Sequence, residues 1–183
     1  MTYYSARELA ESLRTVRKNT IRIAEDIPEA QYGFRPAPET RSVGQLLVHI
    51  ALGSRFQQQI HQAERRTTLE GFNFQALMQQ VMQEEQKPRT KAQIIEMLTH
   101  DGAAWASWIE GLSEAFLAEQ VAMPPGMTPS ARSRFEMLLS TKEHEMHHRG
   151  QLMLIERLIG IVPHLTREMQ ARMAAAQTQG AAR

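Results

Sequence analysis

Cysteine is absent from all 183 residues of the sequence. Its absence excludes disulfide bonds, thiolate nucleophiles and cysteine-bound zinc, so a metal ion would have to bind through His, Asp or Glu. Uninterrupted apolar runs of the roughly 18 residues that span a bilayer are also missing, and we therefore expect no membrane partner. The 21 Lys and Arg residues balance the 20 Asp and Glu residues. The resulting net charge of +1 gives no electrostatic reason to expect a nucleic acid as a partner.

Strand signals are equally scarce. Val and Ile do not alternate with polar residues over a useful length, and hairpin signals such as Asn-Gly are absent. The N-terminus lacks the apolar core of a signal peptide, which favours a cytoplasmic location. The apolar fraction of 42% and the charged fraction of 22% are typical of a globular protein. We therefore expect one all-α domain over residues 1–172, followed by a flexible tail over residues 173–183.

Four capping boxes mark the starts of predicted helices. In a capping box, a Ser or Thr and a Glu or Gln three residues later satisfy each other's backbone N–H groups. Each of the four opens a segment that is free of proline and apolar at helical spacing. They are Ser5 with Glu8, Ser42 with Gln45, Thr90 with Gln93, and Ser133 with Glu136.

The apolar spacing then predicts the helices themselves. Long helices are expected over about 5–26, 43–64, 91–112 and 134–159, a shorter one over about 74–85, and a last one after Pro163. Connections rich in Pro and Gly separate them at 32–41 and 123–130. This pattern predicts a four-helix bundle with an extra short helix and a C-terminal helical tail. In such bundles, sites are built in the core from facing helices.

A histidine-rich run on the predicted helix 134–159 carries the first sign of chemistry. His144 and His148 are four residues apart, so on a helix they lie on one face about 6 Å apart along the axis. Two imidazoles in this arrangement can bind one metal ion. His147 points roughly 100° away from His148 and cannot share that ion without breaking the helix.

His49 adds a third imidazole from a different helix. It lies on the apolar stripe of the predicted helix 43–64, where an imidazole without a partner would cost roughly 1–3 kcal/mol. A metal ion shared with His144 and His148 would supply that partner. Three histidines that leave a fourth position open are typical of a catalytic rather than a structural zinc site. The other candidates, His61, His100 and His164, lack such a context and are predicted to lie at the surface.

The same run also satisfies the zinc-peptidase motif His-Glu-x-x-His, from His144 to His148, in which Glu145 would be the general base. Glu168 follows at a spacing that suits a third ligand in one peptidase class. The longer metzincin motif fails, because Gln151 and Leu154 stand where its glycine and third histidine belong. Those peptidases also bind substrate along a sheet edge, whereas this sequence predicts no sheet, so the peptidase remains a minor alternative.

Three stretches resemble the DinB/YfiT-like superfamily of four-helix-bundle metal proteins. They are IPEAQYGFRPAPETRSVGQLLVHIA at 27–51, the helix after 89–91, and HEMHHRGQL at 144–152. The resemblance implies an up-down-down-up bundle, a metal triad at His49, His144 and His148, zinc or nickel as the ion, and a homodimer. Characterised members of that superfamily include enzymes in which the metal activates a low-molecular-weight thiol.

These observations lead to a divalent-metal-dependent enzyme acting on a small molecule, either a thiol-dependent S-transferase or a hydrolase. Arg149 and Gln151 are candidates for contacts to a cofactor or substrate, and Tyr32 and Arg35 are weaker ones. Glu145 is expected to point away from the metal. The alternative is a non-catalytic metal-binding or stress-response protein, in which the metal stabilises or signals. DNA binding, a third hypothesis, finds no basic patch in the sequence.

Overall fold

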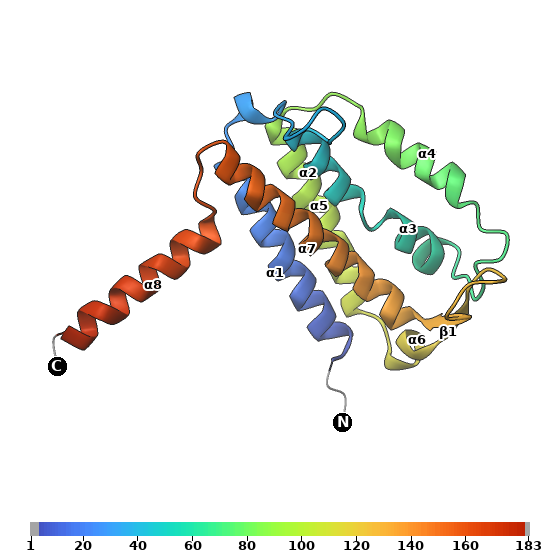
Figure 1. Ribbon diagram of the computed structural model, residues 1–183. Helices are drawn as coiled ribbons and strands as arrows, with labels where there is room; N and C mark the ends of the chain where they lie inside the picture. The colour runs from blue at the N-terminus through green and yellow to red at the C-terminus, as the bar shows by residue number, and fades with distance from the viewer. Residues whose placement is uncertain (1–3, 182–183) are drawn as a thin grey trace.

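Four helices form the bundle in the computed structural model, which describes residues 4–181 (Figure 1). They are α1 (Ala6–Asp26), α2 (Val43–Leu52), α5 (Lys91–Glu110) and α7 (Arg134–Leu158). α1 and α7 run in one direction while α2 and α5 run in the other, and α1 and α2 each pack against both α5 and α7. The predicted all-α, up-down-down-up bundle is therefore confirmed. None of the described helices is both long and apolar enough to cross a membrane.

All four predicted capping boxes are present. The hydroxyl oxygens of Ser42, Thr90 and Ser133 accept hydrogen bonds from backbone N–H groups three residues on, at 3.2, 3.3 and 3.2 Å. The Ser5 box has both of its reciprocal contacts as well. Each cap contributes about 1 kcal/mol to its helix. The starts of the four bundle helices could thus be predicted to within one residue.

The predicted continuous helix 43–64 is wrong. α2 ends at Leu52, and after Gly53 the chain continues as the short α3 (Arg55–Gln57) and a six-residue π-helix, η2 (Gln58–Ala63). A Cβ atom at Gly53 would lie 2.7 Å from Nδ1 of His144. α2 thus ends beside the point where the backbone comes so close to the imidazole that a larger residue than glycine would displace it. π-helical turns within helices frequently occur at functional sites.

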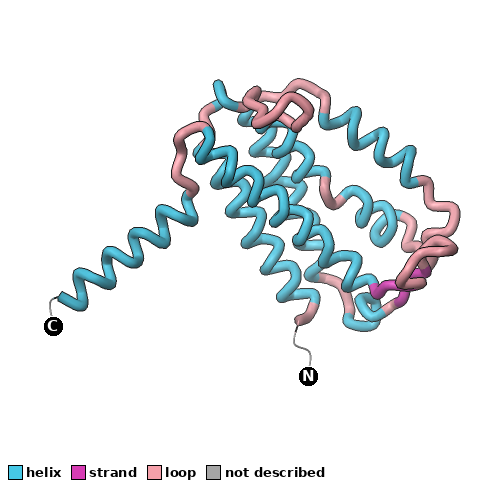
Figure 2. Tube along the Cα trace, viewed as in Figure 1, coloured by secondary structure: helices cyan, strands magenta, loops and turns pink. Residues whose placement is uncertain are grey.

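The connections carry the remaining elements, which Figure 2 colours by type. A 3₁₀ turn, η1 (Glu29–Gln31), precedes α2, and α4 (Phe74–Glu85) crosses from η2 to α5. After α5 come α6 (Glu114–Ala118) and two antiparallel strands, β1 (Gln120–Ala122) and β2 (Ala131–Ser133). The expectation of no strand is therefore wrong. Three-residue strands are too short to show alternation in the sequence, and they pair only because the loop 123–130 returns the chain beside itself.

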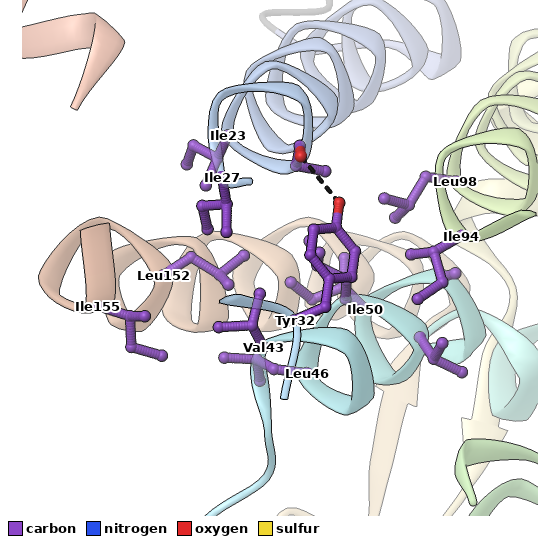
Figure 3. Packing of buried hydrophobic residues seen from close by; sticks show 14 of the residues in the cluster. Ile23, Ile27, Tyr32, Val43, Leu46, Ile50, Ile94, Leu98, Leu152 and Ile155 are labelled. Carbon is purple, nitrogen blue, oxygen red and sulfur yellow. Dashed lines mark hydrogen bonds between the residues drawn. The ribbon is translucent and has the colours of Figure 1, made fainter. Parts of the chain in front are cut away.

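The main hydrophobic core lies where the 32–41 connection meets the bundle (Figure 3). Tyr32 packs among its members, and its hydroxyl donates a hydrogen bond to the Ala24 carbonyl oxygen at 2.8 Å. Tyr32 thus anchors the connection to α1, and its contact to a ligand stays a prediction. The side chains labelled around it come from α1 and its C-cap residue Ile27, and from α2, α5 and α7: Ile23, Ile27, Val43, Leu46, Ile50, Ile94, Leu98, Leu152 and Ile155.

The last helix, α8 (His164–Ala181), extends away from the bundle (Figure 1). Arg167 ties its first turns to α1 through an ion pair with Asp26. The predicted tail 173–183 is helical as far as Ala181, and residues 182–183 lie outside the described part. Its flexibility stays a prediction.

Candidate metal centre

Three histidines from two helices converge in the bundle. α2 supplies His49, and α7 supplies His144 and His148 one turn apart. The Nε2 atom of His144 lies 3.0 Å from Nε2 of His49 and 3.2 Å from Nε2 of His148. One ring nitrogen from each of the three lies within 4.8 Å of the others. The helical spacing and the apolar stripe thus predicted which histidines come together.

These separations suit a shared metal ion. In a tetrahedral site with Zn–N bonds of about 2.0–2.1 Å, neighbouring ligand nitrogens are about 3.3 Å apart. Both Nε2 contacts of His144 are close to that value. Only small movements of the three rings are needed to place all three nitrogens around one ion, and a fourth position would remain for another ligand.

The other ring nitrogen of His49 is hydrogen-bonded to a carboxylate. Its Nδ1 donates to Oε1 of Glu85, the last residue of α4, and Oε2 of Glu85 accepts from Nε of Arg41 at 2.8 Å. Burial alone raises the pKa of Glu85, but the hydrogen bonds from His49 and Arg41 outweigh it and hold the pKa below its ordinary value. The ionised carboxylate keeps the proton on Nδ1, so the lone pair of His49 lies on Nε2.

His148 is oriented in the same way by Gln151. The side-chain oxygen of Gln151 lies 2.8 Å from Nδ1 of His148, and its amide nitrogen lies 3.1 Å from Nε2 of the exposed His147. This arrangement makes Nδ1 of His148 the donor and again places the lone pair on Nε2. Gln151 therefore contacts His148, one of the three histidines that could bind a metal ion. Arg149 is half-buried and makes no hydrogen bond or ion pair among residues 4–181. Contacts of either residue to a cofactor stay a prediction.

His144 occupies the centre of the group. Burial, together with the neighbouring His148 and His49, lowers its pKa to about 4, and burial also lowers the pKa of His148. Both imidazoles are therefore neutral near pH 7, which is the form that binds metal. Nδ1 of His144 packs against Gly53 and has no hydrogen-bond partner within the described chain. The Nε2 atoms of His49 and His148 thus both lie beside that of His144, and the three histidines could hold a metal ion.

The profile of the DinB superfamily matches residues 12–152. The chain belongs to the DinB superfamily. Among solved structures, the fold is similar to a DinB-like protein (YjoA) from Bacillus subtilis, with 18% identity, a TM-score of 0.60, and coverage of 84% of this chain and 92% of that chain. It is also similar to an uncharacterized protein from Clostridium difficile 630, with 12% identity, a TM-score of 0.67, and coverage of 87% and 99%. No curated protein matches the chain significantly.

Glu145 points away from the histidine group of this DinB bundle, as the helical geometry predicted. Its carboxylate lies 2.9 and 3.1 Å from Nε of Arg17 on α1, and both side chains are largely buried. A carboxylate held in this ion pair is not positioned as the general base of a peptidase. Glu168 lies on α8 beside His164 and is not part of the histidine group. The geometry therefore gives the peptidase alternative no support.

Two histidines predicted at the surface are buried, which corrects that prediction. His61 is fully buried on η2, where Arg134 and Gln57 contact its ring nitrogens, and His164 is 3% exposed at the start of α8. His100 is exposed as predicted. The sequence pattern did not reveal the burial of His61, because its partner Arg134 comes from α7 and meets it only in the folded chain.

Two cavities border the centre. The His148-side cavity, of about 650 Å³, is lined by His148, Gln151 and Glu85 together with Arg35 and Arg41. The His144-side cavity, of about 510 Å³, is lined by His49, His144 and mainly apolar side chains of α2, α3, η2, α4 and the 123–130 loop. Both volumes suit small-molecule ligands. The histidine group therefore has two approaches.

Proposed function

We propose that His49, His144 and His148 bind a divalent metal ion, zinc or nickel, and that the protein is a metal-dependent enzyme acting on a small molecule. The observation that carries the proposal is the convergence of three Nε2 atoms, two of which are oriented from behind by Glu85 and Gln151. Outer hydrogen bonds of this kind fix the tautomer and ring orientation of metal-binding histidines.

The reaction is a transfer or a hydrolysis. A bound ion with an open position would lower the pKa of a coordinated thiol or water, and so supply a nucleophile near neutral pH. Glu85 and Arg41 form the wall of the His148-side cavity and hold His49 in place. That cavity has room for a low-molecular-weight thiol, which favours a thiol-dependent S-transferase as the finer assignment.

Metal titration of the purified protein by calorimetry, with elemental analysis, tests the centre. We expect one Zn²⁺ or Ni²⁺ per chain and a loss of this binding in His49→Ala. The exposed His100 gives a matched control, because His100→Ala should bind as the original protein does. Equal binding by both variants would refute the centre.

Activity is tested on the same samples with a series of thiols and electrophiles and with small esters and amides. We expect turnover in the metal-loaded protein, its loss with a chelator, and its return with added metal. If the metal raises the melting temperature but no turnover appears anywhere in the series, the metal-binding stress-response protein becomes the better assignment.

A further inference from the structure

The His144-side cavity is the most apolar space that borders the histidine group. Its walls are aliphatic, aromatic and methionine side chains from seven segments of the chain: Leu52, Phe56, Ile60, Leu69, Phe74, Met78, Val81, Met123, Met127 and Met137. Methionine is flexible and polarizable, so it adapts to apolar and aromatic ligands of different shapes. The cavity therefore suits a molecule with an apolar body.

The polar groups of this cavity are almost all committed elsewhere. The Thr141 hydroxyl donates to the Leu138 carbonyl oxygen and accepts from Nε1 of Trp105. The Ser140 hydroxyl donates to the Met137 carbonyl oxygen at 2.6 Å. Neither hydroxyl has a proton left for a ligand. The remaining donors are the amide of Gln57 and the guanidinium of Arg132, and no carboxylate lines the cavity.

A buried hydrogen-bond chain fixes which end of the Gln57 amide meets the ligand. Arg134, only 1% exposed, donates from its guanidinium to Nδ1 of His61 at 2.9 Å. Because arginine cannot accept, Nδ1 of His61 must be the acceptor and Nε2 must carry the proton. That proton is donated to Oε1 of Gln57 at 2.9 Å. The NH₂ group of Gln57 therefore faces Ser140 and the cavity, where one N–H is free to donate.

Arg132 supplies the charge at the same cavity. It lies in the middle of β2, is exposed, and makes no ion pair within residues 4–181. Oxygen atoms that accept from both an amide and a guanidinium are most strongly bound when they are charged. A carboxylate suits these two donors better than a neutral or basic group.

We propose that the His144-side cavity binds a small apolar carboxylate, with its body among the methionines and its carboxylate between Gln57 and Arg132. This deepens the proposed function, on which the role of that molecule as a substrate rests, since His49 and His144 form one wall of the cavity. Binding itself does not require the metal. Gln57 and Arg132 are then the residues that determine specificity.

Methyl NMR on full-length, metal-free protein with ¹³C-methyl methionine tests the proposal, with 2-naphthoate as the probe. We expect saturable shifts of the Met123, Met127 and Met137 methyl signals. Met82, which lines only the His148-side cavity, and Met169 on α8 should not move. Absence of saturable shifts, or shifts centred on Met82, would overturn the proposal.

Variants and a neutral probe test the carboxylate contact. Arg132→Gln should weaken 2-naphthoate binding by about tenfold or more, the size of one charge-assisted contact. Binding of the neutral 2-naphthamide should change little. Arg55→Gln, an exposed arginine outside the cavity, serves as the matched control and should bind both probes as before. Equal binding of 2-naphthoate by the Arg132 and Arg55 variants would contradict the assigned contact.

Gln57→Glu replaces the donating amide by a carboxylate of the same shape and should repel 2-naphthoate. If circular dichroism shows that this variant does not fold, Arg132→Gln and the neutral probe still decide the question. Because these titrations use metal-free protein, they fail or succeed independently of the metal centre. Protein that binds 2-naphthoate but no metal would refute the proposed function alone.

Discussion

The carboxylate of Glu85 accepts a hydrogen bond from the Nδ1–H group of His49, although the two residues belong to different helices and Glu85 lies on the crossover helix α4. Through this contact, a connecting segment becomes part of the candidate metal centre. Arg41, from the connection before α2, holds the other carboxylate oxygen. The bundle helices supply the histidines, and the connections supply the groups that orient them.

Replacement of that carboxylate should weaken the metal site without destroying it. We expect Glu85→Gln to lower the affinity for Zn²⁺ by about 10- to 100-fold, as outer-shell changes do in other metal sites. The neighbouring Glu84 forms ion pairs with Lys87 and Arg89 instead. Glu84→Gln is therefore the control, and competition with a chromogenic chelator measures both. Identical affinities would show that the His49 contact has no bearing on metal binding.

Gly53 should be needed for the position of His144. A Cβ atom there would lie 2.7 Å from Nδ1, so Gly53→Ala should displace the imidazole and reduce metal binding by at least about tenfold. Gly150 on α7 has open space around it, and Gly150→Ala should leave binding intact and stabilise the helix by about 0.5–1 kcal/mol. Calorimetric titration and thermal melts of both variants give the comparison. Full affinity in Gly53→Ala would mean that the close approach is unimportant.

The buried pair of Arg17 and Glu145 should contribute to stability rather than to catalysis. Arg17→Met leaves the Glu145 carboxylate buried without its cation and should cost about 3–5 kcal/mol. The exposed pair of Arg7 and Glu11 on the same helix is the control, and Arg7→Met should cost less than about 1 kcal/mol. Urea unfolding measures both. An equal loss of unfolding free energy in Arg17→Met and Arg7→Met would contradict a stabilising role of the buried ion pair. The double variant Arg17→Met with Glu145→Met should recover most of the unfolding free energy that Arg17→Met loses.

Glu156 should make the protein less stable as the pH rises. Burial, with a smaller effect of the Asp26 carboxylate, raises the pKa of Glu156 from 4.5 to about 7. Between these values the folded protein holds a proton that the unfolded chain releases, so the free energy of unfolding falls as pH increases. Both carboxyl oxygens lack a hydrogen-bond partner in the described structure, and the charges of Arg167 and Arg157 offset only part of the cost of burying the ionised carboxylate.

Glu156→Gln should therefore stabilise the protein at pH 8 by about 2–3 kcal/mol and change little at pH 4. Thermal melts across this range measure the effect. Glu143→Gln, at an exposed position of the same helix, gives the comparison. A stabilisation of the same size at both pH values would show that ionisation of Glu156 is not the cause.

The bundle and the histidine group could be predicted because local rules determine them. Capping boxes such as Ser133 with Glu136 fix helix starts, and the spacing of His144 and His148 fixes their common face. The role of Glu85 could not be predicted, because no sequence rule pairs a crossover carboxylate with a histidine 36 residues earlier. The break at Gly53 was missed for the same reason, since it depends on a ring that packs against it from α7. The Glu85–His49 hydrogen bond and the approach of His144 to Gly53 are both tertiary contacts, which local sequence patterns do not reveal.

The two cavities at the histidine group have a kinetic consequence. They share only Met78 among their lining residues, and one borders His148 while the other borders His49 and His144. If the proposed transfer takes place, a thiol and an acceptor molecule would therefore be held at the same time, one in each cavity. Turnover by such a centre would pass through a ternary complex. Initial rates measured against both reactants would then give intersecting rather than parallel double-reciprocal lines.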